Sequence, residues 1–483
     1  MAADEHPEPG AAPHRYEPTA SLSGLRARFG ELGPDEATGQ TVTVAGRLML
    51  RRVQGKLLFG TLDDGEARLQ LFARAGATPR FDGLAGRSLG DWLGVRGEVV
   101  TTRRGELSVA VEDWVVLAEA RRPFPDKWHG LADPDTRYRQ RYLDLWVTPE
   151  ARRALVLRSR LTSLTRRWLE DRGFCEVETP VLAALPGGAA ARPFVTHHHA
   201  LDADLYLRVA PELHLKRLVV GGMARVFEIG RVFRNEGISP RHNPEFTMLE
   251  AYAAYLDYHD MMALTEELVA HLATELRGGT ALTYGGRPLD LTPPWERATL
   301  VELVARHAGV EVDVGMGVAE LAARAGDAGV AVDPGWGPGK LVLEIYEKTT
   351  EAELWGPVFV LDYPAEVSPL ARPHRSRPGL VERFEAIVAG RELANAFSEL
   401  TDPDLQRQRL ADQARLRADG DEEAMVVDED YLRALEYGLP PTGGLGIGID
   451  RLVMLLADAP NIRDVIAFPT LRPEAGSGDR RDG

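Results

Sequence analysis

The period of hydrophobic and polar positions changes several times along the chain, and each change predicts a different kind of element. Between Thr41 and about Ala118, apolar residues alternate with polar ones in short runs bounded by turn residues, at 41–47, 55–59, 68–72, 92–100 and 107–111. Such alternation is typical of strands that bury one face. About five short strands in roughly 80 residues predict a small closed barrel, and the five-stranded oligonucleotide-binding (OB) barrel is a natural candidate.

Helical periodicity precedes and follows this region. We expect an amphipathic helix at 22–32 and a longer helix at 150–172. Strand patterns then run to about Tyr258, residues 260–335 are mostly helical and look inserted, strand pattern resumes at 358–361, and a last helix starts at Arg451. The sequence therefore predicts a barrel domain at 17–122, a linker at 123–147 and a second domain at 148–473 with a helical insertion at 258–337, between disordered tails at 1–16 and 474–483.

Composition narrows the class of protein. A chain of 483 residues is too long for one compact core, and 44% hydrophobic with 27% charged residues is ordinary for a globular protein. Cys175 is the single cysteine, the N-terminus has no signal pattern, and no run of about 18 apolar residues occurs, so we expect a cytoplasmic protein without a membrane span. The net charge of −16 does not favour a nucleic-acid-binding protein, although a local basic patch could still bind RNA.

Two strand-like segments on either side of a proline-bearing loop carry charged and aromatic residues on defined faces. Residues of the same parity share a face of a strand, so Arg234 and Glu236 point one way on the first segment. Phe246, Glu250 and Tyr252 share a face of the second. A guanidinium can bind a phosphate through two hydrogen bonds, and an aromatic ring can stack on a purine. Taken alone, the segments could also be a solvent-exposed hairpin with scattered charges.

A third strand-like segment also places polar and aromatic residues on one face. Asn395, Phe397 and Glu399 alternate with three small residues, so they share one face of a predicted strand while small residues line the other. Two polar groups on either side of a ring predict a lined pocket. Upstream, Glu385 and Glu392 offer the oxygen ligands that Mg²⁺ prefers, although a carboxylate pair alone is more often a surface feature.

The segment 443–451 is rich in glycine and turns helical at its end, where an arginine could bind a terminal phosphate. Two other motifs fail: at 339–340 a Gly-Lys pair lacks the serine or threonine of a phosphate-binding loop, and three consecutive histidines at 197–199 cannot converge on one zinc ion in a strand. The combined pattern of arginines, carboxylates and glycines suits a site that holds ATP beside a cationic amino acid.

The chain resembles the class II lysyl-tRNA synthetases of the bacterial type over about residues 17–473. Segments 172–180, 233–246 and 444–451 resemble the three motifs of class II synthetases, and segments 186–198 and 394–400 resemble the lysine branch. The resemblance implies an α+β fold, with an N-terminal OB-fold barrel that binds the anticodon and a class II catalytic domain whose antiparallel sheet is flanked by helices. It also implies a homodimer. The chain departs from the family pattern at His199, His214 and Ala251.

The resemblance also implies roles by position. Catalysis would rest on Arg234 and Arg451. ATP would be bound by Arg234, Glu236, His242, Asn243, Phe246 and Arg451. Lysine would be bound by Gly188, Glu212, Glu250, Tyr252, Asn395, Phe397 and Glu399. Mg²⁺ would be held by Glu385 and Glu392, and anticodon bases would meet Phe59 and Gln70.

These roles predict ATP-dependent activation of L-lysine to lysyl-adenylate and its transfer to tRNA(Lys). One alternative is a paralogue that activates lysine or an analogue for another acceptor, and another is an RNA-binding regulator with an inactive synthetase fold. The aromatic barrel face favours tRNA as the acceptor. An aspartate-type relative is disfavoured because Glu250 and Glu399 would repel an acidic substrate.

Overall fold

The computed structural model describes residues 12–124 and 131–474, so most of both predicted tails and part of the predicted linker lie outside the described residues. The chain divides into two compact units. Unit 1 runs to Asp133 and includes Tyr142–Val147, and unit 2 comprises Pro134–Arg141 and the chain from Thr148 onward. Two short helices follow the barrel in the sequence: α3 (Pro134–Arg139), which belongs to unit 2, and α4 (Arg141–Val147), most of which belongs to unit 1.

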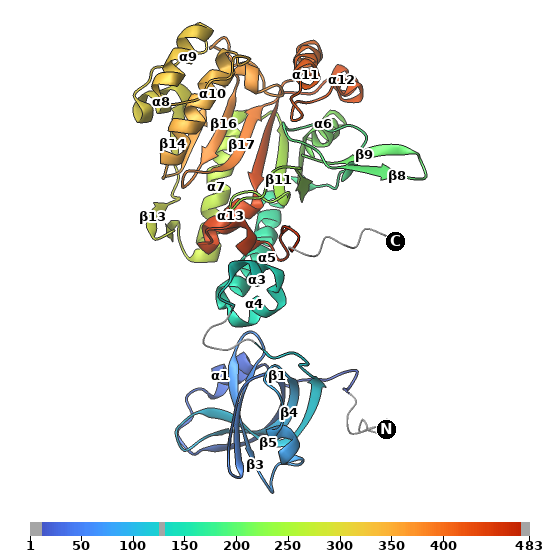
Figure 1. Cartoon of the computed structure of the whole chain (residues 1–483), viewed down its shortest axis with the longest axis vertical. Coiled ribbons are helices and arrows are strands. Elements are labelled where there is room, and N and C mark those ends of the chain that lie inside the picture. Colours follow the sequence, from blue (N-terminus) through green and yellow to red (C-terminus); the bar gives the residue numbers. More distant parts are fainter. Residues whose placement is uncertain (1–11, 125–130, 475–483) are drawn as a thin grey trace. The chain divides into compact units, whose positions relative to one another are not determined.

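Unit 1 is a closed five-stranded barrel, which confirms the predicted OB fold (Figure 1). Its strands are β1 (Ala37–Gln54), β2 (Leu57–Asp63), β3 (Arg68–Arg74), β4 (Trp92–Thr101) and β5 (Leu107–Ala118), joined in the order β1-β2-β3-β5-β4. β3 and β5 run parallel, and β4 closes the barrel on β1. The inward residues of the strands form a core of their own with α1 (Leu22–Phe29), and α2 (Phe81–Ala85) adds Leu84 to it.

Unit 2 is built on an eight-stranded, mainly antiparallel sheet in the order β14-β15-β16-β17-β18-β11-β10-β6. Its strands are β6 (Cys175–Glu176), β10 (Arg225–Phe233), β11 (Glu245–Ala254), β14 (Glu296–Thr299), β15 (Val358–Leu361), β16 (Arg383–Ile387), β17 (Glu392–Ser398) and β18 (Thr442–Gly448). Among the described strand pairs of this sheet, only the outermost two, β14–β15 and β10–β6, are parallel. The antiparallel sheet predicted for the second domain is therefore confirmed.

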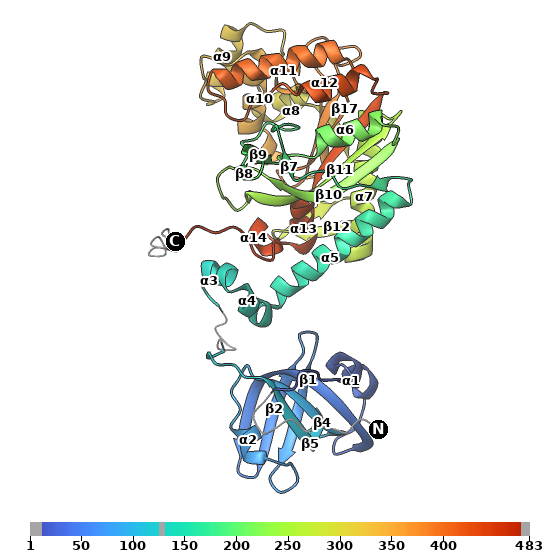
Figure 2. The ribbon, with the colours of Figure 1, turned by 90° about the vertical axis from the view of Figure 1, so that its right-hand side faces the viewer.

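Three helices pack on the sheet through one continuous core: α5 (Pro149–Glu170), α7 (Tyr258–Arg277) and α13 (Ile449–Ala457). The helix predicted at 150–172 and the one predicted from Arg451 are thus present, the second starting two residues earlier. α7 begins where Asp257 caps it and ends at Gly278, whose φ of 82° suits a residue without Cβ. Figure 2 shows α5 at the opposite end of the sheet from α11 (Pro403–Ala418) and α12 (Glu429–Glu436).

The region predicted as a helical insertion begins with α7 and also holds α8 (Leu300–Ala308) and α9 (Val318–Asp327). It further contains three short strands that were not predicted: β12 (Ala281–Tyr284), β13 (Arg287–Asp290) and β14, the last an edge strand of the main sheet. A separate core joins α8 and α9 to α10 (Pro338–Thr349) and β15. Short turns of 3₁₀ helix lie at Glu351–Glu353 and Ala365–Val367.

The remaining elements of the described residues are short. They are β7 (Leu182–Ala183), β8 (Val195–His198) and β9 (Ala203–Leu207), which form a small sheet, with α6 (Glu212–Val220) and α14 (Ile462–Val465). None of the helices in the described residues is both long and apolar enough to cross a membrane.

Candidate active site

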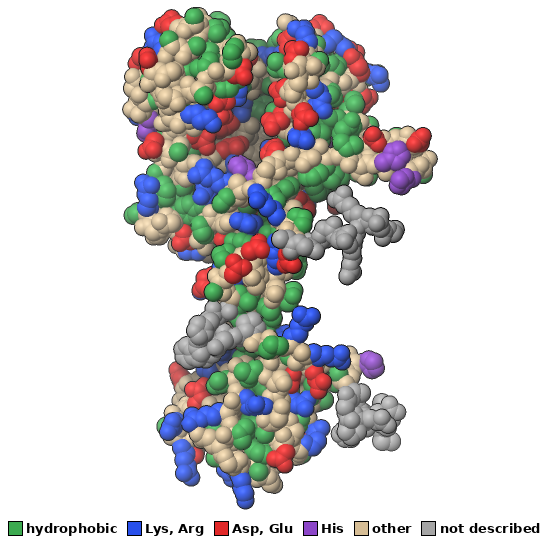
Figure 3. All heavy atoms as spheres, in the orientation of Figure 1, with side chains coloured by type: hydrophobic (Ala, Val, Ile, Leu, Met, Phe, Trp, Pro, Cys, Tyr) green, Lys and Arg blue, Asp and Glu red, His purple; other side chains and the backbone are tan. Residues whose placement is uncertain are grey.

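One large cavity of unit 2, of about 420 Å³, gathers residues from distant parts of the sequence. In Figure 3, acidic and basic side chains collect in a hollow between the α8–α10 region and the α11–α12 region. The cavity is lined by every residue predicted for the second domain except Glu399. These lining residues are Gly188, Glu212, Arg234, Glu236, His242, Asn243, Phe246, Glu250, Tyr252, Glu385, Glu392, Asn395, Phe397 and Arg451. None of the positions that depart from the family pattern, His199, His214 and Ala251, is among the residues that line it.

The first wall follows from the pairing of β10 and β11. Val232 lies opposite Phe246, and the chain leaves β10 at Arg234, whose amide donates to the carbonyl of Pro244 at 2.8 Å. The guanidinium of Arg234 lies over the Phe246 ring, 5.2 Å from its centroid. Burial lowers the pKa of Arg234, and its Nε has no hydrogen-bond partner among the described residues. A buried cation with an open donor is suited to an anionic ligand.

The loop between these strands adds polar groups beside the arginine. His242 lies 3.0 Å from the Ser239 hydroxyl through Nδ1, and burial together with Arg451 lowers the pKa of His242. Asn243 is buried and donates to the carbonyl of Glu245 at 2.6 Å, while its Oδ1 has no partner within the part of the chain that the structure describes. The loop therefore offers both an acceptor and a neutral imidazole to a ligand.

The same sheet continues from β11 to β18 and β17, and its register places glycines of β18 opposite the lining residues of β17. Asn395 lies opposite Gly446, and Phe397 lies opposite Gly444. A Cβ atom on Gly444 would come within 1.8 Å of Glu399 Oε1. Glycine is therefore required at this position by the space that a carboxylate occupies.

The acidic end of the cavity contains a buried cluster. Tyr252 donates to Glu250 at 3.1 Å, and burial, helped by Glu212, raises the pKa of Glu250 to about 8. Lys216 of α6 lies behind the cavity wall and pairs with Glu212 at 2.6 Å and with Glu399. Glu399 is fully buried, so it adjoins this end of the cavity without lining it.

Two further carboxylates face the basic part of the cavity. Glu392 accepts from Arg451 at 2.9 Å, and Glu385 accepts from Arg383 at 2.7 Å. Burial and the neighbouring Glu392 raise the pKa of Glu385 to about 7. Burial and Glu392 also raise the pKa of Glu351 to about 7. Burial opposes ionisation of Glu392, but Arg451 outweighs it and lowers the pKa of Glu392. Glu385 and Glu392 both line the cavity, and two neighbouring carboxylates offer the oxygen ligands that fit a divalent cation.

Packing fixes Arg451 at the start of α13. Its neighbour Asp450 accepts from the amide of Thr247 at 2.6 Å and pairs with Arg158 of α5. Arg158 also donates to the Thr247 hydroxyl at 2.9 Å. The start of α13 is therefore tied to both β11 and α5, which holds Arg451 toward the cavity.

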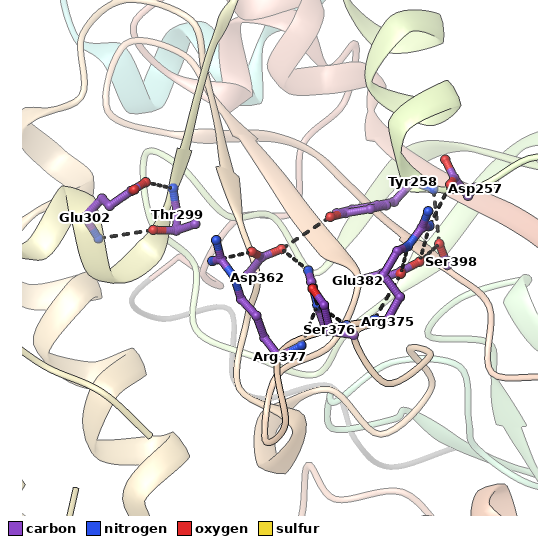
Figure 4. A network of polar contacts seen from close by, with 11 residues as sticks. Asp257, Tyr258, Thr299, Glu302, Asp362, Arg375, Ser376, Arg377, Glu382 and Ser398 are labelled. Carbon is purple, nitrogen blue, oxygen red and sulfur yellow. Dashed lines mark hydrogen bonds and ion pairs between the residues drawn. The ribbon is translucent and has the colours of Figure 1, made fainter. Parts of the chain in front are cut away.

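On the other face of β17, a polar network holds the strand from behind (Figure 4). Ser398 donates to Glu382 at 2.6 Å, Arg375 pairs with Glu382, and the same arginine reaches Asp257 at the start of α7 at 2.7 Å. Burial opposes ionisation of Glu382, but Arg375 and Ser398 outweigh it and lower its pKa to about 2. The network thus anchors the strand that presents Asn395 and Phe397.

In unit 1, Phe59 and Gln70 lie on the outer face of β2 and β3. The Phe59 ring is 5.4 Å from that of Phe72, and Gln70 donates to the Ser108 hydroxyl at 2.9 Å. Alternate residues such as Leu58 and Leu71 fill the barrel core, so the two predicted residues share the half-exposed side.

Three residues of the second unit were missed by sequence reasoning. Lys216, Arg383 and Glu351 each pair with or perturb a predicted carboxylate. Only Arg383 lines the cavity itself. The i,i+4 spacing of Glu212 and Lys216 was the available signal for the first, but that spacing is also usual on exposed helix faces.

Comparison with known proteins agrees with this geometry. Residues 133–472 match the family of class II tRNA synthetases (D, K and N), and residues 42–117 match the OB-fold nucleic acid binding domain. The chain is similar to the lysine–tRNA ligase of Moorella thermoacetica, with 54% identity over 473 residues, 97% of this chain and 94% of the relative. It is also similar to those of a Synechococcus species (strain CC9605; 55% over 471 residues, 96% and 94% of the two chains) and Nostoc punctiforme (52% over 472 residues, 95% and 84%). The chain therefore belongs to the class II tRNA synthetases of the D, K and N group.

Proposed function

We propose that this protein activates L-lysine with ATP and transfers the lysyl group to the 3′ end of tRNA(Lys). The observation that carries the proposal is a single cavity with a buried acidic cluster at one end and Arg234 and Arg451 at the other. Lysine has an ammonium at each end of its length, and ATP is strongly anionic, so the charge pattern suits both substrates side by side. The identity to lysine–tRNA ligases over nearly the whole chain supports the same function.

The acidic end would bind the amino acid. Glu212 and the backbone at Gly188 would hold the α-ammonium, and Asn395 would lie near the carboxylate. Gly188 has a φ of 89°, and a Cβ there would meet the Glu212 side chain at 3.2 Å. Phe397 would flank the aliphatic stem, with Glu250, Tyr252 and Glu399 around the ε-ammonium. Such a cluster of buried carboxylates favours a cationic side chain over an uncharged analogue, because the ammonium adds positive charge to an excess of acidic groups.

The basic end would bind ATP. Phe246 would stack on adenine, with Glu236 near the adenine amine and His242 and Asn243 in the phosphate loop. Arg451 would bind the γ-phosphate. Mg²⁺, with Glu385 and Glu392 as its protein ligands, would supply neutralisation of phosphate charge.

The first reaction step then requires only that the lysine carboxylate and the α-phosphate of ATP are aligned. A lysine carboxylate oxygen attacks the α-phosphorus, and the bond to the departing pyrophosphate breaks. Arg234 stabilises the charge on the α-phosphate, so no protein nucleophile is needed. In the second step a ribose hydroxyl of the tRNA 3′ end attacks the lysyl carbonyl, and AMP leaves.

Two further parts belong to the proposal. The barrel would bind the anticodon, with bases stacked on Phe59 and hydrogen-bonded to Gln70. The protein would act as a cytoplasmic homodimer. Three apolar side chains close together in the sequence around β7 are between 41% and 47% exposed, Val181, Leu182 and Leu185, and they support a surface that another chain covers.

The test is pyrophosphate exchange with each amino acid, followed by charging of total tRNA. We expect exchange to require lysine and charging to be confined to tRNA(Lys). Exchange with lysine but no charging would support the alternative of a paralogue with another acceptor. Exchange driven by another amino acid, or absent with all of them, would refute the proposal.

A further inference from the structure

Lys216 is a buried cation that the proposed reaction leaves without a role. It lies in the second turn of α6, four residues after Glu212, and its side chain is fully buried. The helix starts at Glu212, so this spacing puts both side chains on one face. A buried lysine costs a great deal unless its charge is compensated, so its partners are informative.

Those partners are the carboxylates expected to bind the two ends of the substrate. Nζ of Lys216 lies 2.6 Å from Glu212 Oε1 and also contacts Glu399 Oε2. The first is the carboxylate expected at the α-ammonium, and the second is expected at the ε-ammonium. Nζ is also 5.3 Å from the centroid of Phe397, the ring expected along the aliphatic stem. One ammonium thus connects both ends of the amino-acid pocket from behind.

Without this cation, buried carboxylates would face one another. Burial raises the pKa of all three; Glu212 further raises the pKa values of Glu250 and Glu399, and Glu250 further raises that of Glu399. Lys216 acts in the opposite direction on each of the three carboxylates. Burial would lower the pKa of Lys216, but Glu212 and Glu399 more than offset it and raise the pKa above its ordinary range. The lysine therefore stays charged and favours the ionised form of its partners.

We infer that Lys216 is a positioning residue for lysine selection, which fixes the separation of Glu212 and Glu399 and keeps both carboxylates ready for the two ammonium groups of the substrate. This inference rests on the proposed function. It assigns no contact with substrate to Lys216, because the residue does not line the cavity.

The experiment compares Lys216→Gln with a matched control, Lys340→Gln. Lys340 also pairs with a glutamate at i,i+4, at 2.7 Å, but on α10 and partly exposed. Pyrophosphate exchange gives KM for lysine, KM for ATP and kcat over a range of pH. We expect Lys216→Gln to raise the lysine KM about 30-fold or more, as for loss of one partner of a buried charge pair, with a smaller change in the ATP KM. The acidic limb of kcat/KM for lysine should move to higher pH, because a carboxylate must then lose a proton to bind substrate.

Several results would overturn the inference. One is a lysine KM for Lys216→Gln within about twofold of the control, and another is an equal rise in both KM values, which indicates a merely structural role. If Lys216→Gln does not fold, Lys216→Arg decides, because it keeps the charge and enlarges the head group. For Lys216→Arg the lysine KM should rise several-fold, while the ATP KM and the acidic limb of kcat/KM stay unchanged. Equal changes in both KM values, or no change in either, would refute the inference. Failure of wild-type protein to exchange with lysine would instead refute the proposed function.

Discussion

Replacement of Gly444 by alanine tests the geometry of the amino-acid pocket with a single methyl group. The new Cβ would lie 1.8 Å from Glu399 Oε1 and 2.6 Å from Tyr252 Cε1. Carbon atoms do not approach an oxygen within 3.0 Å in such contacts, so the carboxylate must move by at least about 1.2 Å. Gly444 has no positive φ, so alanine adds no backbone strain that would confuse the result.

A displacement of about 1 Å in a positioning group costs on the order of 100-fold in rate. We therefore expect kcat/KM for lysine to fall about 100-fold in pyrophosphate exchange, mainly through KM, with a much smaller change in the ATP KM. Gly446→Ala is the matched control on the same strand face. Its Cβ would meet the flexible end of Met248 at 3.2 Å, so the lysine KM should stay within about threefold of wild type.

Equal lysine KM values for the two alanine variants would refute the idea that Gly444 makes room for Glu399. A loss confined to the ATP KM would show that this strand limits the nucleotide instead. Thermal unfolding of both variants separates a local clash from a global loss of stability.

Three further predictions concern other parts of the molecule. Arg451→Ala should reduce lysine-dependent exchange by about 100-fold or more, because a donor to phosphate is lost, whereas Arg433→Ala, on an exposed arginine of α12, should not; equal activities would refute the assignment. Phe59→Ala should reduce tRNA charging about 10-fold to 100-fold through loss of base stacking and leave exchange without tRNA unchanged; a loss of exchange would contradict a separate role for the barrel. Glu382→Gln should destabilise the fold by up to about 3 kcal/mol at neutral pH, because the pKa of Glu382 lies at about 2 in the folded state against an ordinary 4.5. Since this pKa is depressed, the stabilisation is present above about pH 4.5 and is lost as pH falls toward 2, so urea unfolding of wild type and variant should converge in acid; a difference independent of pH would refute the ionic account.

The sequence predicted the faces of strands well. Alternation placed Asn395 and Phe397 on one side of β17, and both line the cavity. Alternation does not indicate how deeply a side chain is buried, however. Glu399, two residues further along the same face, lies behind the cavity wall. Parity alone could not distinguish a lining carboxylate from one buried against Lys216.

Short elements and long-range pairs were the weak points. β14 reads Glu-Arg-Ala-Thr, which has no hydrophobic alternation, because its place in the sheet depends on the parallel partner β15 far along the chain. Arg383 lies two residues before Glu385 on β16, so strand parity could have placed the two side chains on one face. Glu351 lies in a segment without a distinctive local pattern, and its effect on Glu385 and relation to Glu392 depend on the folded chain.

The ion pair between Arg451 and Glu392 has a consequence for how the substrates enter. In the proposed reaction the arginine turns to the triphosphate and the carboxylate turns to the divalent ion, yet here each neutralises the other at 2.9 Å. If the triphosphate alone bound Arg451, Glu392 would lose its counter-ion, and if the metal ion alone bound Glu392, Arg451 would lose its counter-ion. When both ligands bind, one ion pair is replaced by two. Nucleotide and metal uptake should therefore be thermodynamically linked, each strengthening the other's affinity by the same factor.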